Sequence, residues 1–164
     1  MEEHCKEGAC GSHAGASSHQ QQQAEQDRAV TASLKRIRHK FLVMSGKGGV
    51  GKTSVSVNLA MALAAQGHKV GLMDVDIHGP DVPRMLGLTG MLEMNDNRKM
   101  IPVPYSKTLS AVSIESLMTG KDDAIIWRGP MKHSVIRQFI ADVDWGDLDY
   151  LIIDSPPGTG DEPL

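Results

Sequence analysis

The sequence contains few cysteines, few aromatic residues and no long apolar run. Only two cysteines, two tryptophans, two tyrosines and two phenylalanines occur among its 164 residues. Since the cysteines, Cys5 and Cys10, lie close together near the N-terminus, the sequence implies no disulfide framework. No apolar stretch approaches membrane-spanning length, the N-terminus has no apolar signal segment, and the net charge of −3 argues against a dedicated nucleic-acid surface. We therefore expect a cytoplasmic protein whose partners include neither a membrane nor a nucleic acid.

Residues 1–29 are polar and have few large apolar side chains. A segment of this composition cannot bury much surface, so we expect a disordered tail. Within it, Cys5 and Cys10 lie among histidines, and thiolates and imidazoles at such short spacing could ligate zinc, copper or an iron–sulfur centre. Because the spacing matches no strong zinc pattern, cysteines that bind no metal are an open alternative. Residues 30–164 suffice for one globular domain, which is predicted to begin with a short amphipathic helix over residues 30–40.

A glycine-rich motif, GKGGVGKT, occupies Gly46–Thr53. It has the G-x-x-x-x-G-K-T spacing of a phosphate-binding P-loop. The apolar run Phe41–Met44 before it predicts a buried strand, and Ser54–Gln66 after it predicts a helix. The motif therefore has the strand–loop–helix context of a P-loop, with a glycine-rich turn that only caps a helix as the alternative.

The chemistry expected of such a loop follows from its residues. Glycines allow the backbone to approach a phosphate, and backbone N–H groups then surround it at the positive end of the helix dipole. Lys52 would contact the β- and γ-phosphates, and the Thr53 hydroxyl would bind Mg²⁺. The expected phosphate-binding residues are Gly46, Lys47, Gly48, Gly49, Val50, Gly51, Lys52 and Thr53.

Three aspartates follow predicted strands. Asp74 and Asp76 come after one apolar run, and Asp154 comes after a longer one. Carboxylates at the carboxyl ends of parallel strands lie where doubly wound sheets bind ligands. Asp74 could serve Mg²⁺ or orient a water, or it could cap the next turn; Asp76, which opens a loop, is better placed for chemistry. Asp154 is expected beside the P-loop strand, where it would accept a bond from a magnesium-bound water or from Thr53.

The remaining pattern predicts the fold class. Apolar runs alternate with helical patterns, which indicates an α/β fold with a mostly parallel sheet flanked by helices. In the helix after the P-loop, Val55, Leu59 and Leu63 are expected to face the sheet. Residues 156–161 are predicted to form a stiff turn in which Gly158 could present its amide to a γ-phosphate.

Lys47 makes the glycine loop resemble the deviant Walker A loop of the MinD/ParA/nitrogenase iron-protein class. Within that class, four further segments resemble the Mrp/ApbC-type P-loop iron–sulfur carriers. They are Asp74–Pro80, Pro83–Gly87, Trp127–Met131 and Asp154–Asp161. The likeness extends from about Leu34 to the last residue, and because several separate motifs agree we regard it as close.

The resemblance implies a P-loop NTPase that binds ATP with Mg²⁺, hydrolyses ATP, and assembles iron–sulfur clusters of the [4Fe-4S] type or transfers them to apoproteins. It also implies a homodimer in which Lys47 reaches the nucleotide of the partner. Asp76 matches the carboxylate that positions the attacking water, and Asp154 matches the Walker B position that serves Mg²⁺. The catalytic residues implied by the resemblance are Lys47, Lys52 and Asp76.

Two departures from the family pattern bear on these expectations. Asp81 occupies a position where the family usually has serine, which adds a negative charge beside the Asp76 loop. Family members also continue through further β–α units to a C-x-x-C pair, which this sequence lacks. We therefore expect a C-terminally truncated fragment with an incomplete sheet, in which Cys5 and Cys10 are the thiolates available to a cluster. A MinD/ParA-like partitioning or positioning ATPase and a non-catalytic nucleotide-binding fragment are the alternative interpretations.

Overall fold

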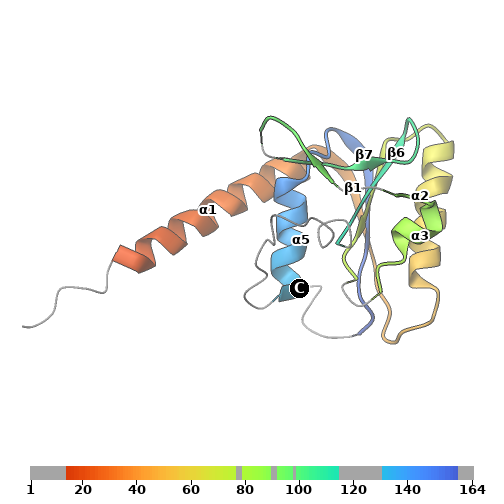
Figure 1. Ribbon diagram of the computed structural model, residues 1–164, viewed down its shortest axis with the longest axis horizontal. Helices are drawn as coiled ribbons and strands as arrows, with labels where there is room; N and C mark the ends of the chain where they lie inside the picture. Colours follow the sequence, from red (N-terminus) through yellow and green to blue (C-terminus); the bar gives the residue numbers. More distant parts are fainter. Residues whose placement is uncertain (1–13, 77–78, 90–91, 98, 115–130, 159–164) are drawn as a thin grey trace, which may run out of the picture.

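The fold is built on a central sheet with helices on both faces (Figure 1). The computed structural model describes residues 14–76, 79–89, 92–97, 99–114 and 131–158, with the backbone alone for 14–23 and 131–135. The five strands of the sheet lie in the order β1 (Ile37–Val43), β7 (Leu148–Asp154), β2 (Val70–Asp74), β6 (Leu109–Ser113) and β5 (Val103–Pro104). Adjacent strands from β1 to β6 are parallel, and β5 is antiparallel to β6. This architecture confirms the predicted α/β fold with a mostly parallel sheet.

Helices cover the two faces of the sheet (Figure 1). The bounds of the elements outside the sheet are α1 (Ala14–Lys35), α2 (Lys52–Ala65), α3 (Val82–Leu86), β3 (Glu93–Met94), β4 (Met100–Ile101) and α5 (Met131–Asp142). Helices α2 and α3 pack on one face, α1 and α5 pack together on the other, and β3 and β4 form a separate antiparallel pair. Within the described part of the chain, no helix is long and apolar enough to cross a membrane.

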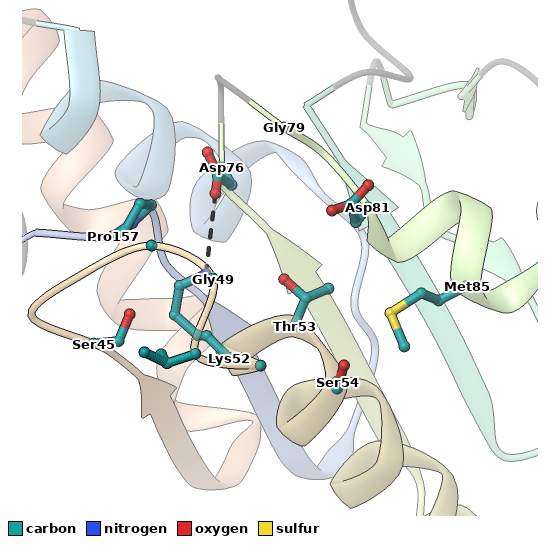
Figure 2. Close-up of a pocket in the computed structure, with 13 residues that line it drawn as sticks. Ser45, Gly49, Lys52, Thr53, Ser54, Asp76, Gly79, Asp81, Met85 and Pro157 are labelled. Carbon is teal, nitrogen blue, oxygen red and sulfur yellow. Dashed lines mark ion pairs between the residues drawn. The ribbon is translucent and has the colours of Figure 1, made fainter.

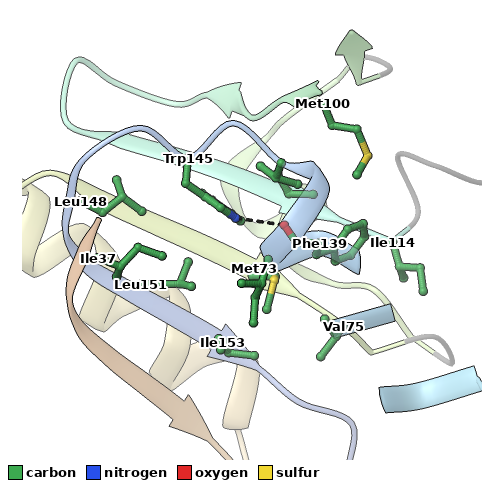
Figure 3. Close-up of a cluster of buried hydrophobic side chains, with 13 residues drawn as sticks. Ile37, Met73, Val75, Met100, Ile114, Phe139, Trp145, Leu148, Leu151 and Ile153 are labelled. Atoms are coloured by element: carbon green, nitrogen blue, oxygen red, sulfur yellow. Dashed lines mark hydrogen bonds between the residues drawn. The ribbon is translucent and has the colours of Figure 1, made fainter. Parts of the chain in front are cut away.

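Two hydrophobic clusters hold the helices against the sheet. In the larger one, on the α5 face, Phe139 is fully buried and the indole N–H of Trp145 donates to its carbonyl oxygen at 3.2 Å (Figure 3). Trp145 also packs over Gly71 of β2, where an added Cβ would come within 2.8 Å of the indole ring. The second cluster packs Val57 of α2 against Leu72 of β2. The sheet is therefore buried on both faces along β2 and β7.

The register of the central strands brings three loops together. Strand β7 lies between β1 and β2, and Asp154 is in register with Val43 on one side and with Asp74 on the other. Since these strands are parallel, the segments that follow them emerge at the same edge of the sheet. The predicted position of Asp154, beside the strand that precedes the P-loop, is thereby confirmed.

The N-terminal helix differs from the prediction. The sequence predicts a disordered tail up to residue 29 and a helix over residues 30–40, whereas α1 runs from Ala14 to Lys35. Alanine, glutamine and glutamate have high helix propensity, and Val30 and Leu34 pack against the larger cluster. The helix cannot extend to residue 40 because β1 begins at the buried Ile37.

The predicted buried face of α2 is only partly right. Leu59 and Leu63 pack against the second cluster, but Val55 is 56% exposed. The helix instead turns Ser56 toward the sheet, where its hydroxyl donates to Asp154 at 3.0 Å. Ser56 shares the buried face of α2 with Val57 and Ala60, and this rotation leaves Val55 on the outer side.

Strand β1 is more exposed than the prediction of a buried strand at Phe41–Met44 allows. Phe41 is 44% exposed and Leu42 is 40% exposed. Among the described residues, only β7 pairs with β1, which therefore forms one edge of this sheet. The prediction of a strand is therefore confirmed, but the prediction that the strand is buried is wrong for Phe41 and Leu42.

Candidate phosphate-binding site

The loop between β1 and α2 has the backbone shape of a phosphate cradle. Gly49 and Gly51 have positive φ angles of 74° and 88°, a conformation that residues with a Cβ rarely adopt. Helix α2 begins directly after Gly51, and the Val55 N–H already donates to the Gly51 carbonyl oxygen at 3.0 Å. Because glycine has no side chain with which to cap the helix, the N–H groups of the first turn remain available to an anion.

A pocket of about 400 Å³ lies beside this loop (Figure 2). Its walls come from the P-loop and the start of α2, from the segment between β2 and α3 together with α3 itself, and from the turn after β7. The lining residues are Ser45, Gly48, Gly49, Val50, Gly51, Lys52, Thr53, Ser54, Asp76, Gly79, Asp81, Met85 and Pro157. The structure thus brings Asp76, which the sequence places in a separate loop, to the same pocket as residues 48–53.

The Lys52 ammonium lies between two carboxylates, of which Asp76 lines the pocket and Asp154 does not. Its Nζ is 3.4 Å from Asp154 Oδ1 and 4.0 Å from Asp76 Oδ2, the contact drawn in Figure 2. The side chains of all three residues are largely buried. A cation held in place by buried partners is preorganised to stabilise negative charge that arrives beside it.

Asp154 is held by a serine that the sequence interpretation missed. The carboxylate is 1% exposed, and its Oδ1 accepts the Ser56 hydroxyl in addition to facing Lys52. The Lys52 carbonyl oxygen, 3.2 Å from the Ser56 hydroxyl, is the alternative acceptor for its single proton. Ser56 follows Lys52 by four positions, so both lie on the same side of a helix, and that spacing was the available signal.

The turn after β7 is fastened to the P-loop. Ser155 donates to the Val43 carbonyl oxygen from its N–H (3.2 Å) and from its hydroxyl (2.8 Å). The Gly158 N–H, which the sequence predicts to face a phosphate, donates to the Ser45 carbonyl oxygen at 2.9 Å. These bonds bring Pro157 to the pocket wall and tie the end of β7 to the start of the P-loop.

Asp74 organises the segment between β2 and α3. Its carboxylate accepts the Asp76 N–H at 3.1 Å, the Val82 N–H at 3.3 Å and the Ser113 hydroxyl at 3.3 Å. Burial is the main cause that raises the pKa of Asp74 to about 7; the nearby carboxylates of Asp154 and Asp76 add to it, and the two N–H donors oppose it. Of the two roles that the sequence left open for Asp74, these bonds favour the capping of the next turn.

Other predicted site residues lie away from the pocket or outside the described chain. Lys47 is exposed, and neither it nor Gly46 contributes to the pocket wall. Cys5, Cys10 and the segment Trp127–Pro130 lie outside the described residues. Over the ranges that the structure does describe, no three His, Cys, Asp or Glu side chains gather in a group suited to hold a metal ion.

Comparisons with known proteins agree with this geometry. The family model for ParA-type proteins, described as NUBPL iron-transfer P-loop NTPase, matches residues 36–164. An iron-sulfur cluster carrier protein of Saccharolobus solfataricus is 54% identical over 138 residues, which cover 84% of this chain and 47% of that protein. The cytosolic Fe-S cluster assembly factor NUBP2 of Mus musculus is 46% identical over 140 residues, covering 84% and 51% respectively.

A solved structure gives the same result for the fold. The nucleotide-binding protein of Archaeoglobus fulgidus in complex with ADP is similar with a TM-score of 0.71 and 40% identity, over 84% of this chain and 52% of that one. The chain spans about half the length of the curated relatives it matches. The resemblance to P-loop iron–sulfur carriers is confirmed by these matches. The chain belongs to the ParA family of NUBPL-type iron-transfer P-loop NTPases.

Proposed function

We propose that the protein binds and hydrolyses ATP and thereby assembles iron–sulfur clusters or transfers them to apoproteins. The observation that carries the ATPase part is the placement of Lys52 between Asp76 and Asp154 in a pocket walled by a P-loop. The iron–sulfur part is supported by relatives that are named cluster carriers or assembly factors. We also propose a cytoplasmic location, as the name of the mouse relative suggests.

Nucleotide binding would use the backbone first and Lys52 second. The N–H groups of residues 48–53 would donate to the phosphate oxygens, and the Lys52 ammonium would neutralise charge on the β- and γ-phosphates. The backbone of Gly46 and Lys47 would complete the loop around the phosphates. Gly158 would exchange its bond to Ser45 for one to a γ-phosphate, which would couple the turn after β7 to the nucleotide state.

The oxygen donors of the pocket fit a magnesium ion. Mg²⁺ prefers hard oxygen ligands; the Thr53 hydroxyl and the Asp76 carboxylate line the pocket, and the buried Asp154 carboxylate lies 3.4 Å from the pocket residue Lys52. Thr53 and Asp154 are the residues that would hold it, directly or through water. When bound, the ion would neutralise charge on the β- and γ-phosphate oxygens.

Hydrolysis needs a water placed in line with the bond that breaks. The Asp76 carboxylate would accept a hydrogen bond from a water molecule, whose oxygen attacks the γ-phosphorus as the bond to the ADP oxygen breaks. Lys52 would stabilise the charge that develops on the transferred phosphoryl group, and the products are ADP and inorganic phosphate.

Lys47 would act on a second copy of the chain. Its ammonium is exposed and lies outside the wall of its own pocket, which suits a group that reaches the nucleotide of a homodimer partner. Lys47→Ala should therefore abolish ATP-dependent dimerisation, measured by analytical ultracentrifugation. Lys40→Ala, at another exposed lysine, is the matched control. An ATP-dependent dimer that survives in the Lys47 variant would contradict this role.

The decisive experiment for the ATPase combines binding with turnover. Lys52→Ala should weaken ATP binding by at least about 100-fold, measured by calorimetry, since it removes the cation that would contact the phosphates and leaves the negative charges of Asp76 and Asp154 facing them. Asp76→Asn should preserve binding and slow hydrolysis. Unchanged ATP affinity in the Lys52 variant would refute the P-loop assignment, and no ATP binding by the wild-type chain would favour a non-catalytic fragment.

Iron and acid-labile sulfide assays after anaerobic reconstitution test the cluster-carrying part. Bound iron and sulfide are expected in wild-type protein, with Cys5 and Cys10 as the candidate thiolates in this chain. Cys5→Ser and Cys10→Ser should lower the bound iron if they ligate the cluster. ATP hydrolysis without any bound iron would favour a partitioning-type ATPase.

A further inference from the structure

The carboxylate of Asp74 holds both ends of the segment that carries Asp76. Its Oδ1 accepts the N–H of Asp76, and its Oδ2 accepts the N–H of Val82 at the start of α3. Oδ2 also accepts the hydroxyl of Ser113, the last residue of β6. Asp74 is 0% exposed and Ser113 is 2% exposed, so water does not compete for these bonds.

We infer that Asp74 and Ser113 are positioning residues for ATP hydrolysis, which fix the backbone of Asp76 so that its carboxylate faces the pocket. The inference rests on the proposed function and extends it to two side chains that are not part of the pocket wall. Strand β6 pairs with β2 in parallel, with Ser113 in register with Asp74. The hydroxyl therefore reaches the carboxylate from the neighbouring strand and limits the positions that the carboxylate can take.

The effect of these bonds should fall on turnover more than on nucleotide binding. The phosphate cradle belongs to the loop after β1, whereas Asp76 belongs to the segment after β2; Lys52 contacts Asp76, but its shorter contact is to Asp154 of β7. Losing the bond from Asp76 to Asp74 would release the Asp76 backbone and leave the cradle and Lys52 in place. A displacement of about 1 Å at a reacting group can lower turnover by about 100-fold.

The test compares kcat with KM for ATP hydrolysis in a set of single variants. Asp74→Asn keeps the shape of the side chain but replaces one acceptor oxygen with a donor amide, so kcat should fall by about tenfold or more while KM changes by less than about threefold. Ser113→Ala should lower kcat by a smaller factor. Ser113→Thr, which keeps the hydroxyl but adds a methyl group at a buried position, should keep a higher kcat than Ser113→Ala. Ser110→Ala, on the same strand, is the matched control.

The outcomes separate the inference from the proposed function. Wild-type turnover in both Asp74→Asn and Ser113→Ala, or a rise in KM with kcat unchanged, would overturn the positioning role alone. No turnover in the wild-type protein would overturn the proposed hydrolysis and the positioning role with it. If thermal melting shows that Asp74→Asn is unfolded, the contrast between Ser113→Ala and Ser113→Thr decides, because both leave Asp74 in place.

Discussion

A buried carboxylate at the end of β2 should make stability depend on pH. The pKa of Asp74 is raised from 3.8 to about 7, so between these values the folded state holds a proton that the unfolded state releases. The free energy of unfolding should therefore fall as pH rises from about 4 to 7, by at most about 4 kcal/mol for a shift of this size. Denaturant titrations at several pH values would show this fall in wild type and a flatter profile in Asp74→Asn. Equal pH profiles for the two proteins would contradict the assignment.

Asp81 places a further negative charge on the wall of a pocket proposed to bind a polyanion. Its carboxylate is about half exposed and lies 3.6 Å from Arg84, so solvent and that guanidinium weaken its field. An exposed charge contributes up to about 1 kcal/mol, so Asp81→Ser should tighten ATP binding by about two- to fivefold, more in EDTA than with Mg²⁺. Calorimetry would measure both affinities. Asp96→Ser, at an exposed turn residue that is not in the pocket wall, should change neither, and equal effects of the two substitutions would contradict a local role for Asp81.

At the scale of elements, the packing of side chains over β2 requires a glycine at position 71. At Gly71 an added Cβ would lie 2.7 Å from Leu148 Cδ1 and 2.8 Å from the ring of Trp145. Gly71→Ala should therefore force these side chains apart and destabilise the fold by about 1–3 kcal/mol, the usual cost of overpacking a core. Chemical denaturation would measure the loss, with Ser110→Ala on the adjacent strand as the control. If Gly71→Ala had the same free energy of unfolding as the control, the predicted clash with Leu148 and Trp145 would be contradicted.

The elements around the pocket were the most predictable part of this fold. The motif Gly46–Thr53 follows an apolar run, and a second apolar run ends at Asp154. Patterns of this kind predict the local structure without knowledge of contacts between distant parts of the chain. The rotation of α2 was not predictable in this way, because its buried face includes the polar Ser56, whose partner Asp154 is about 100 positions away in the sequence. The same holds for Asp74, whose partners Val82 and Ser113 are identified only once β2 and β6 are paired.

At the scale of the whole molecule, the exposed strand β1 should promote self-association of the 164-residue chain. Phe41 and Leu42 point to opposite faces of an edge strand and both are exposed, and such edges pair with other chains. Leu42→Lys should weaken this association and change the free energy of unfolding by no more than about 0.5 kcal/mol, as surface substitutions usually do. Sedimentation at increasing protein concentration would measure it.

Measurements with and without ATP distinguish this association from the proposed dimer. Self-association through β1 should be the same with and without ATP and should persist in Lys47→Ala, whereas the dimer that uses Lys47 should require ATP. A Leu42→Lys chain that associates as strongly as wild type would show that β1 is not the contact.

The position of β7 in the sheet has a consequence for how the protein acquires its pocket during synthesis. The P-loop and the Asp76 segment are translated early, yet their strands β1 and β2 each pair with β7, the last strand of the described chain. Until β7 has left the ribosome and inserted between them, these two strands have no common neighbour and Lys52 lacks Asp154. A nascent chain that ends before residue 148 should therefore not retain ATP, and the capacity to bind nucleotide should appear in a single step once residues 148–154 have been made.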